Sequence, residues 1–397
     1  MALAVKQSEK SRQTDLKVAY SASKAVRSVG IDQMALTRVA ADAGFSSGAI
    51  YARCDDRSEL VVLAWEKSFW PMLREILEAL IAAVSTSSND DLARLEDLLN
   101  AATDPDVIPD LGSAMEVIVA GRRDEVIAEV VHRDILALMD DHGVGASTDG
   151  PRRQAVVAGM AMIFGASLLN SAYEVPGLGP IDPMPLLRVF SSTSATPTKP
   201  AKAHGPMTPV SPVPFPTTHD EVRDALIAAT EYVIARSGVH KATVSRIARR
   251  AGVSVGAIYG LYENKEALVG DCLDVLFPPQ AKRDTTRWVS VFTATDQRAE
   301  ITSILADYMS PHLEQWRRFR LECLVAARHS PSVAKRLLRY ASMARESLLE
   351  AAMRAPATAS IRIDTGIPAR ATVIGLGIVD IIDPTVSRLD WRWLPVR

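Results

Sequence analysis

The hydrophobic positions of this chain recur at helical spacing, and one such pattern occurs twice. In each copy the apolar residues stand at positions i, i+7 and i+8, which places them on one face of an α-helix. They are Val18, Ala25 and Val26 in the first copy and Leu226, Val233 and Ile234 in the second, 208 residues further on. Ala and Leu are abundant and runs of β-branched residues are scarce. The pattern and the composition together predict an all-α protein.

Two apolar helices are predicted further along the chain, over Arg152–Tyr173 and Arg370–Ile382. The first contains the apolar run Ala155–Leu169, which is shorter than the roughly 18–20 residues that span a bilayer. We therefore expect a buried helix and no membrane partner. Small residues in both helices would allow close helix–helix approach, either in ordinary packing or in a subunit-type interface. They are Ala158, Gly159 and Gly165 in the first and Gly375 and Gly377 in the second.

A longer repeat surrounds the tetrapeptide GAIY. Residues 43–60 read AGFSSGAIYARCDDRSEL and residues 251–268 read AGVSVGAIYGLYENKEAL, so that Thr37–Leu60 aligns with Ser245–Leu268 without a gap. Deeper in each half, Val117–Val131 resembles Leu324–Leu338 if one residue is inserted. These matches indicate a tandem duplication of whole halves, since repeats are read from self-similarity at a fixed period.

A proline-rich stretch separates the two halves. Ser191–His219 contains seven prolines and many Ser, Thr and Ala residues, so it is predicted to be a semi-rigid linker that reaches on the order of 90 Å when extended. Five segments follow from this division: a first helix-turn-helix domain (1–60), a first helical regulatory domain (61–190), the linker (191–219), a second helix-turn-helix domain (220–268) and a second helical regulatory domain (269–397).

The local chemistry of the second copy predicts two short helices joined by a tight turn. Thr243 can cap a helix through VSRIARRA, Gly252 can end it in a left-handed conformation, and Ser254 can cap the next helix. No acidic residue lies between Ala251 and Tyr262 to repel phosphate. The second helix of such a unit typically enters the DNA major groove.

The segment 243–268, TVSRIARRAGVSVGAIYGLYENKEAL, resembles the DNA-binding signature of TetR-family transcriptional repressors. The resemblance implies an all-α chain of two tandem TetR-like units, each a three-helix helix-turn-helix domain followed by a helical ligand-binding and dimerisation domain. It also implies that Ser245, Val255 and Gly256 lie near base edges, and that Tyr259 and Lys265 contact phosphates. Arg246 belongs to a local basic cluster with Arg249 and Arg250.

The first copy departs from this pattern. Ala35 stands where Thr243 caps its helix, and Asp42 stands where the second copy has Arg250. Asp55 and Asp56 add negative charge, although either one could instead cap the following helix. The residues of this copy that could still contact DNA are Thr37, Ser47, Gly48, Tyr51, Arg53 and Arg57.

Composition adds mainly exclusions. The net charge of −2 offers no global attraction for nucleic acid, so any DNA binding must rest on a local surface. The three cysteines are widely spaced, which predicts neither disulfides nor a zinc site and suits a reducing cytoplasm. Cys54 is predicted to pack in the core and not to sense redox state. No nucleophile elbow, phosphate-binding loop or acid–base pair occurs, so we expect no enzyme, cofactor or metal.

These features predict a sequence-specific DNA-binding transcription regulator in the cytoplasm, whose partner is a double-stranded DNA operator. By the resemblance it would be a ligand-responsive repressor, with an apolar small-molecule effector bound by a subset of the aromatic and methionine residues behind each motif, and the sequence does not say which. These residues are Trp65, Phe69, Trp70, Met115 and Met139 in the first half and Phe277, Trp288, Phe292, Tyr308, Trp316 and Phe319 in the second. The leading hypothesis is a single-chain pseudodimer on an asymmetric operator. Two alternatives stay open. In the first alternative, only the second helix-turn-helix binds DNA and the chain forms a homodimer. In the second, the chain is a small-molecule-binding or interaction protein that has lost DNA binding.

Overall fold

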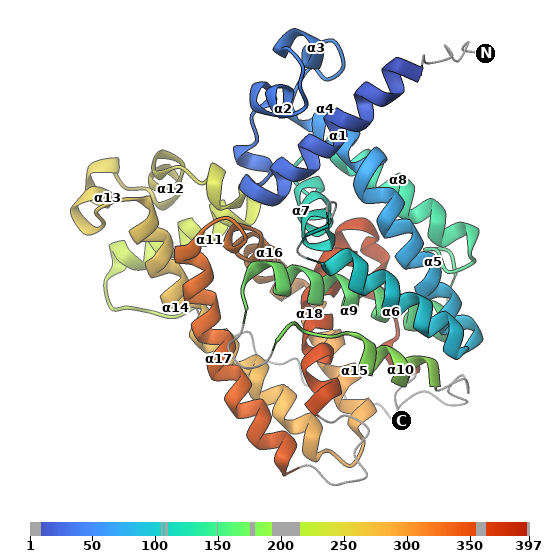
Figure 1. Cartoon of the computed structure of the whole chain (residues 1–397). Helices are drawn as coiled ribbons and strands as arrows, with labels where there is room; N and C mark the ends of the chain where they lie inside the picture. Colours follow the sequence, from blue (N-terminus) through green and yellow to red (C-terminus); the bar gives the residue numbers. More distant parts are fainter. Residues whose placement is uncertain are drawn as a thin grey trace.

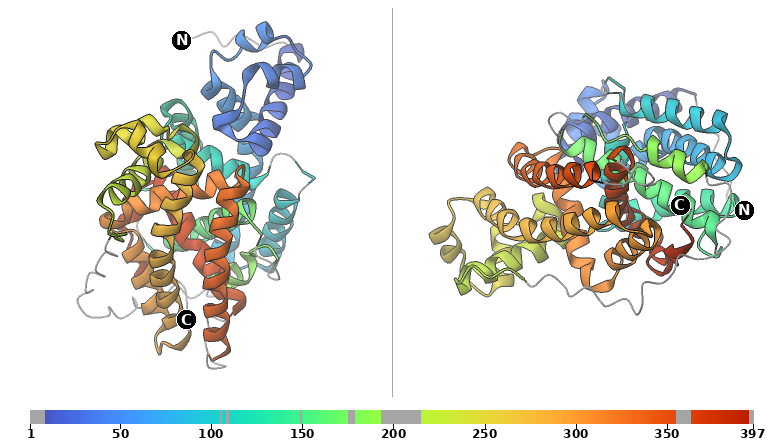
Figure 2. Two further views of the ribbon diagram at one scale, coloured as in Figure 1. Left: turned by 90° about the vertical axis from the view of Figure 1, so that its left-hand side faces the viewer. Right: turned by 90° about the horizontal axis from the view of Figure 1, so that it is seen from below.

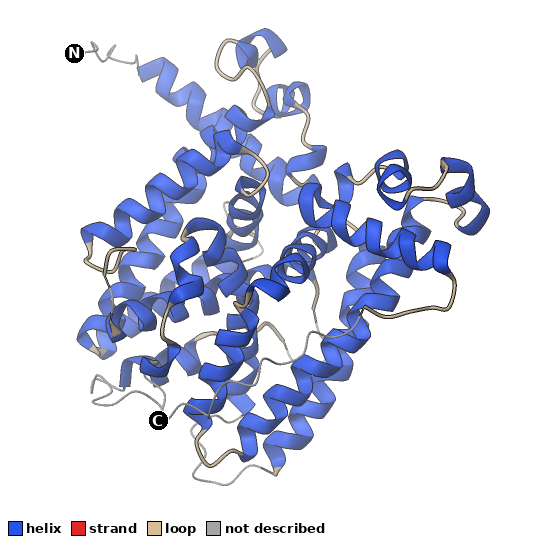
Figure 3. Cartoon of the chain, turned by 180° about the vertical axis from the view of Figure 1, so that it is seen from behind, coloured by secondary structure: helices blue, strands red, loops and turns tan. Residues whose placement is uncertain are grey.

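The computed structural model describes residues 9–104, 106–107, 110–148, 150–174, 179–192, 215–354 and 363–394. Within these ranges the chain is helical and contains no strand, as Figure 3 shows. The all-α prediction is therefore confirmed.

The first half begins with the long helix α1, continues with short helical elements around the GAIY motif and ends in longer helices. Its helices are α1 (Glu9–Val29), η1 (Ile31–Gln33), α2 (Leu36–Asp42), α3 (Ser47–Tyr51), α4 (Arg57–Ala64), the π-helical turn η2 (Trp65–Phe69), α5 (Trp70–Thr86), α6 (Asn89–Thr103), α7 (Leu111–Gly121), α8 (Glu125–Asp141), α9 (Pro151–Ala172) and α10 (Met184–Ser192).

The second half follows a similar order. Its helices are α11 (Glu221–Lys241), α12 (Val244–Ala251), α13 (Val255–Leu261), α14 (Lys265–Thr293), α15 (Gln297–Tyr308), η3 (Pro311–Leu313), α16 (Glu314–Ala327), α17 (Pro331–Met353), α18 (Ile363–Ile382), η4 (Pro384–Arg388) and η5 (Trp391–Trp393). In Figure 1 the two helix-turn-helix pairs, α2–α3 and α12–α13, lie at the outer edge of the molecule.

The capping predictions for the second motif are confirmed. The Thr243 hydroxyl accepts a hydrogen bond from the Arg246 amide at 3.3 Å, and Gly252 ends α12 with φ of 72°. Ser254 caps α13 by accepting from the Ala257 amide at 3.1 Å. In the first motif Ala35 gives α2 no side-chain cap, as its sequence predicts.

The structure also decides between the two interpretations of the acidic pair in the first motif. The Asp56 carboxylate accepts a hydrogen bond from the Glu59 amide at 3.0 Å and caps α4. Asn264 caps α14 in the same way, by accepting from the Ala267 amide at 2.9 Å. Asp56 is therefore a structural cap, and its charge lies at the helix N-terminus, where a carboxylate is favourable.

Three of the predicted segment boundaries fall inside helices. Helix α4 continues through the boundary at residues 60 and 61, and α14 continues through that at 268 and 269. Each helix-turn-helix therefore shares a helix with the region behind it. At the start of the predicted linker, Ser191 and Ser192 still belong to α10. The middle of that linker, residues 193–214, lies outside the described residues.

Helices α9 and α18 form the centre of the molecule, as Figures 1 and 2 show, and α7 and α16 pack beside them. A Cβ atom on Gly165 would overlap the carbonyl oxygen of Ala371, and one on Gly375 would overlap that of Ala161. The two helices thus cross in backbone contact, which only glycine permits. The 22-residue α9 is long and apolar enough to cross a membrane, but 83% of its most apolar window is buried inside the protein. It behaves as the buried helix that the sequence predicts.

Candidate nucleic-acid interface

The second helix of each motif presents one tyrosine outward. Ile50 and Ile258 are 1% exposed and anchor α3 and α13 to their domains, whereas Tyr51 is 51% exposed and Tyr259 is 56% exposed. A tyrosine selected only for packing would have its ring covered. The two phenolic hydroxyls are therefore placed where they could reach an external acceptor such as a phosphate oxygen.

The predicted base-edge residues lie on the same open surface. Ser47 and Val255 are the first residues of α3 and α13, and both are exposed. Gly48 and Gly256 follow them, also exposed, and their hydrogen side chains leave the backbone accessible. Thr37 and Ser245 are exposed in the first turns of α2 and α12.

The predicted cationic contacts of the first motif are engaged within their own domain. Arg53 donates through Nε to Asp15 and through Nη1 to the Ala49 carbonyl, each at 2.9 Å. Arg57 donates to the Asp32 carbonyl at 2.9 Å. These hydrogen bonds tie the motif to α1 and to the turn that follows α1, a role that the sequence does not reveal.

The cations of the second motif are engaged in the same way. Lys265 donates to the carbonyls of Val239 and His240, each at 3.1 Å, and Arg246 donates to the Lys241 carbonyl at 3.0 Å. The acceptors lie at the end of α11, where cations are favoured because the carbonyls point outward. An ammonium has three donors, so these two carbonyls leave one donor of Lys265 unused by them.

Buried charged residues connect each helix-turn-helix domain to the body of the protein. The connection lies at Gly30, directly after α1, and at Gly238, near the end of α11, where φ is +80° and +79°. A Cβ on Gly30 would lie 2.7 Å from the ring of His329, and one on Gly238 would lie 2.9 Å from the Glu322 carboxylate. Each domain therefore meets the body through a glycine for which both conformation and space exclude a side chain.

Glu116, on α7, holds the first of these junctions. Its carboxylate accepts a hydrogen bond from the Ile31 amide at 2.8 Å and lies 2.7 Å from Nε2 of His329. It also pairs with Arg328. Because Arg328 and His329 follow α16, the first helix-turn-helix domain is connected through Glu116 to the second half of the chain.

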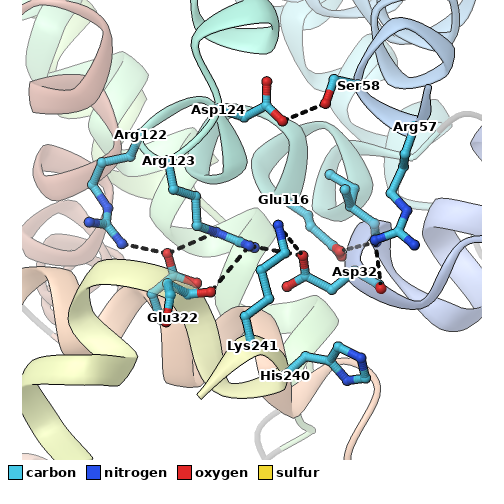
Figure 4. Close-up of polar contacts among 12 residues, drawn as sticks. Asp32, Arg57, Ser58, Glu116, Arg122, Arg123, Asp124, His240, Lys241 and Glu322 are labelled. Atoms are coloured by element: carbon cyan, nitrogen blue, oxygen red, sulfur yellow. Dashed lines mark hydrogen bonds and ion pairs between the residues drawn. The ribbon is translucent and has the colours of Figure 1, made fainter. Parts of the chain in front are cut away.

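Glu322, on α16, holds the second junction, which Figure 4 shows in close-up. Its carboxylate pairs with Arg122 at 2.5 Å and with Nε of Arg123 at 3.4 Å. The Arg123 guanidinium also donates to Asp32 at 2.9 Å, and the Lys241 ammonium lies 3.5 Å from the same carboxylate. Asp32 belongs to the first helix-turn-helix domain and Lys241 to the second, so one charged network reaches both domains.

The environment shifts the pKa values of the two carboxyls in opposite directions. Burial raises the pKa of Glu322, and the charges of Arg123 and Arg122 only partly oppose it. Burial also acts to raise the pKa of Asp32, but the hydrogen bond and charge of Arg123, with the charge of Lys241, lower it overall. Asp32 is therefore the firmly ionised member of the network.

Sequence reasoning did not identify these two junctions, although the sequence carries a signal for them. Each buried glutamate is followed six and seven residues later by two basic side chains, in EVIVAGRR from Glu116 and in ECLVAARH from Glu322. These two segments align without a gap. The pattern is easily missed because a glutamate in a helix is ordinarily expected to face solvent.

A cavity of about 580 Å³ lies among the helices behind the second motif. Phe277, Trp288 and Trp316 line it, three of the aromatic residues from which the sequence predicts an effector pocket. Among the described residues, no group of three or more His, Cys, Asp or Glu side chains is arranged to hold a metal ion.

Comparison with known proteins matches one part of the chain to a family. Residues 226–272 match the family model of bacterial regulatory proteins, tetR family. This segment runs from within α11 to the start of α14 and contains the whole second helix-turn-helix. No curated protein matches the chain. The family match supports a DNA-binding transcription regulator of the TetR family, and the second helix-turn-helix is the segment that carries it.

Proposed function

We propose that the chain regulates transcription as a single-chain pseudodimer, in which each half supplies one helix-turn-helix to one operator. The observation that carries this proposal is the reciprocal crossing of α9 and α18. Gly165 of α9 packs on Ala371 of α18, and Gly375 of α18 packs on Ala161 of α9. On each helix the glycine follows the alanine by four residues. A contact in which residue i meets j′ and residue j meets i′ is typical of a twofold subunit interface.

The charged junctions add a second reciprocal pair. Glu116 pairs with Arg328 and His329 of the other half, and Glu322 pairs with Arg122 and Arg123 of the other half. Because α9 and α18 already cover each other within one chain, this face is not available to a second chain. The linker would keep the two halves at high effective concentration.

The two reading surfaces differ, so the proposed operator is asymmetric. Ser47 begins α3 where Val255 begins α13. Side chains near the base edges would then offer a hydroxyl in one half-site and a methyl surface in the other. Exposed Asp42, Asp55 and Asp56 also make the first surface more acidic than the second.

Ligand control belongs to the same proposal. It is supported by the cavity behind the second motif, whose volume falls within the range of about 300–1,000 Å³ that small-molecule sites commonly have. Repression of transcription is the direction implied by the family resemblance.

Substitution of the exposed tyrosines tests the proposal. DNA that the purified chain selects from a random-sequence pool would serve as the operator in gel shifts. Tyr51→Phe and Tyr259→Phe should each weaken binding by roughly 3–10-fold, since each removes about one hydrogen bond. Tyr20→Phe removes an equally exposed hydroxyl from α1 and should leave affinity unchanged. Unchanged affinity in both test variants would remove the assigned surface.

The second candidate is that only the second motif reads DNA and that two chains associate by another face. It is favoured by the family match, which covers only the second motif, and by the exposed acids of the first. Under this alternative Tyr259→Phe weakens binding while Tyr51→Phe does not.

A further inference from the structure

The cavity behind the second motif is built by both halves of the chain. Half of its lining residues come from α14, α16, α17 and α18, which belong to the second half. The rest comes from the ends of α6 and α9 and from residues 179–184, which belong to the first half. The site is therefore complete only when the two halves are packed together as they are in Figure 1.

The amino acids on α14 explain why space opens at this place. The cavity-facing side of this helix carries Ala281 and Asp284 between Phe277 and Trp288. In the first half, α5 turns larger apolar residues inward, and each is no more than 1% exposed. They are Leu73, Ile76, Leu77 and Leu80. Small and polar residues on α14 thus leave a volume that leucine and isoleucine side chains fill on α5.

The apolar wall of the cavity is aromatic. The rings of Phe277 and Trp316 meet edge to face with centroids 4.9 Å apart, and Tyr340 stacks on Phe277 at 5.9 Å. Trp288 lies on the same face of α14 and is buried. Aromatic rings fixed by one another in this way offer flat surfaces on which a planar molecule can stack.

The polar group best placed to orient a ligand is Arg320 of α16. Its Nη1 donates to Asp284 at 3.1 Å and its Nη2 donates to the Tyr308 hydroxyl at 2.7 Å. Its Nε is buried and has no hydrogen-bond partner among the described residues. Arg320 lines the cavity, and the two hydrogen bonds use only two of the five N–H donors of its guanidinium, whose charge is neutralised by Asp284.

We propose that this cavity binds one neutral, largely apolar aromatic molecule per chain, with an oxygen acceptor of the ligand facing the guanidinium of Arg320. The molecule would be the effector of the regulator, so this inference rests on the proposed function. A carboxylate ligand is disfavoured because it would lie beside Asp284. Among the other charged lining residues, Glu174 and Asp182 outnumber Arg345.

The same helices connect the cavity to the junctions of the DNA-binding domains. Arg320 stands two residues before Glu322 on α16. Ala371 and Ile374 of α18 line the cavity beside Gly375, which contacts α9. A ligand that shifts α16 or α18 would therefore act on the charged network and on the crossing of the two halves. Through both it would alter the spacing of the two motifs.

Ligand binding to the full chain without DNA tests the inference. Flavone, a neutral planar ketone, would be titrated while tryptophan fluorescence is followed, since Trp288 and Trp316 line the cavity. A flavone carboxylate and a flavone carrying a quaternary ammonium group would be titrated in the same way. We expect flavone to bind at least tenfold more tightly than either charged analogue. Tighter binding of a charged analogue, or no flavone binding below about 1 mM, would overturn the inference.

Two variants place the ligand in this cavity. Arg320→Met should weaken flavone binding by roughly 10-fold, because it removes a charged donor, whereas Arg318→Met on the outer side of α16 should not. Ala281→Trp should fill the cavity and abolish binding, with circular dichroism as the check on folding. A folded Ala281→Trp variant that binds flavone like the parent would contradict the site. DNA affinity is measured separately. If the chain binds flavone but no operator DNA, the proposed function is refuted while the ligand site is retained.

Discussion

Glu322 provides the most quantitative test of how the two halves are joined. Its carboxylate is 1% exposed and lies between the guanidiniums of Arg122 and Arg123, which are themselves 12% and 9% exposed. The substitution Glu322→Gln keeps the shape of the side chain and removes its charge. Two buried cations then lose their nearest anion, although Arg123 keeps its hydrogen bond to Asp32.

The expected cost follows from burial. Removing one partner of a buried ion pair costs about 3–5 kcal/mol, because the remaining charge stays buried without compensation. Since Asp32 still compensates Arg123, we expect the lower end, about 3 kcal/mol of unfolding free energy. Glu314→Gln is the matched control on the same helix. Glu314 is 49% exposed and pairs with Arg318 one turn away, so its loss should cost under about 0.5 kcal/mol.

Urea unfolding followed by circular dichroism measures both variants against the parent chain. A shift of the midpoint without a change in slope would report a change in stability alone. Glu116→Gln should be destabilising to a similar degree, because Glu116 is 3% exposed and pairs with Arg328 of the other half, as Glu322 pairs with Arg122. If Glu322→Gln and Glu314→Gln proved equally mild, the buried network would not hold the halves together and the reasoning would be refuted.

Three further predictions concern the DNA-binding domains. Gly238→Ala should destabilise the chain by more than Gly252→Ala. Both glycines have positive φ, which costs alanine about 1–2 kcal/mol, but only at Gly238 would the new Cβ also lie too close to the Glu322 carboxylate. Equal urea midpoints for the two variants would contradict this. Burial raises the pKa of Cys54 to about 11, so its thiol should resist iodoacetamide at neutral pH in the native chain and react after denaturation in guanidinium. Rapid labelling of the native chain would show that the Cys54 thiol is accessible to solvent. The hydrogen bonds from Arg223 lower the pKa of Asp271 below its ordinary value of 3.8, so the stability that they provide is fully present above pH 3.8 and is lost as the pH falls through the lowered pKa. Asp271→Asn should therefore make stability fall less steeply on the acid side of a stability–pH curve, and an unchanged acid side would count against the assignment.

Local sequence chemistry predicted the helix-turn-helix elements well. Thr243, Gly252 and Ser254 act where their capping and turn preferences place them, because these effects depend on a few neighbouring residues. The apolar periodicity of α1 and α11 likewise identified buried faces, since one face of a helix must be covered. The predicted boundaries at residues 60 and 268 fall inside α4 and α14, which continue from one region into the next, and no local signal marks that continuity.

Contacts between distant segments were beyond local reasoning. Lys265 was expected at a phosphate and Arg53 was expected among the residues that could contact DNA. Neither expectation foresaw the hydrogen bonds that both residues make to the first helix of their own domain. The network of Glu322, Arg123 and Asp32 joins residues roughly 90–290 positions apart, which periodicity cannot bring together. The cavity depends on Ala281 facing segments of the other half, so it too follows only from the packed structure.

The mass of the protein–DNA complex tests the central claim most directly. Mass photometry of the purified chain on a single DNA site selected from a random pool would count the chains bound. A single-chain pseudodimer adds one chain, 43.0 kDa, to the mass of the DNA at every concentration up to saturation. Saturation at twice that added mass, with no one-chain complex at lower concentration, would show that two chains must associate and would contradict the account.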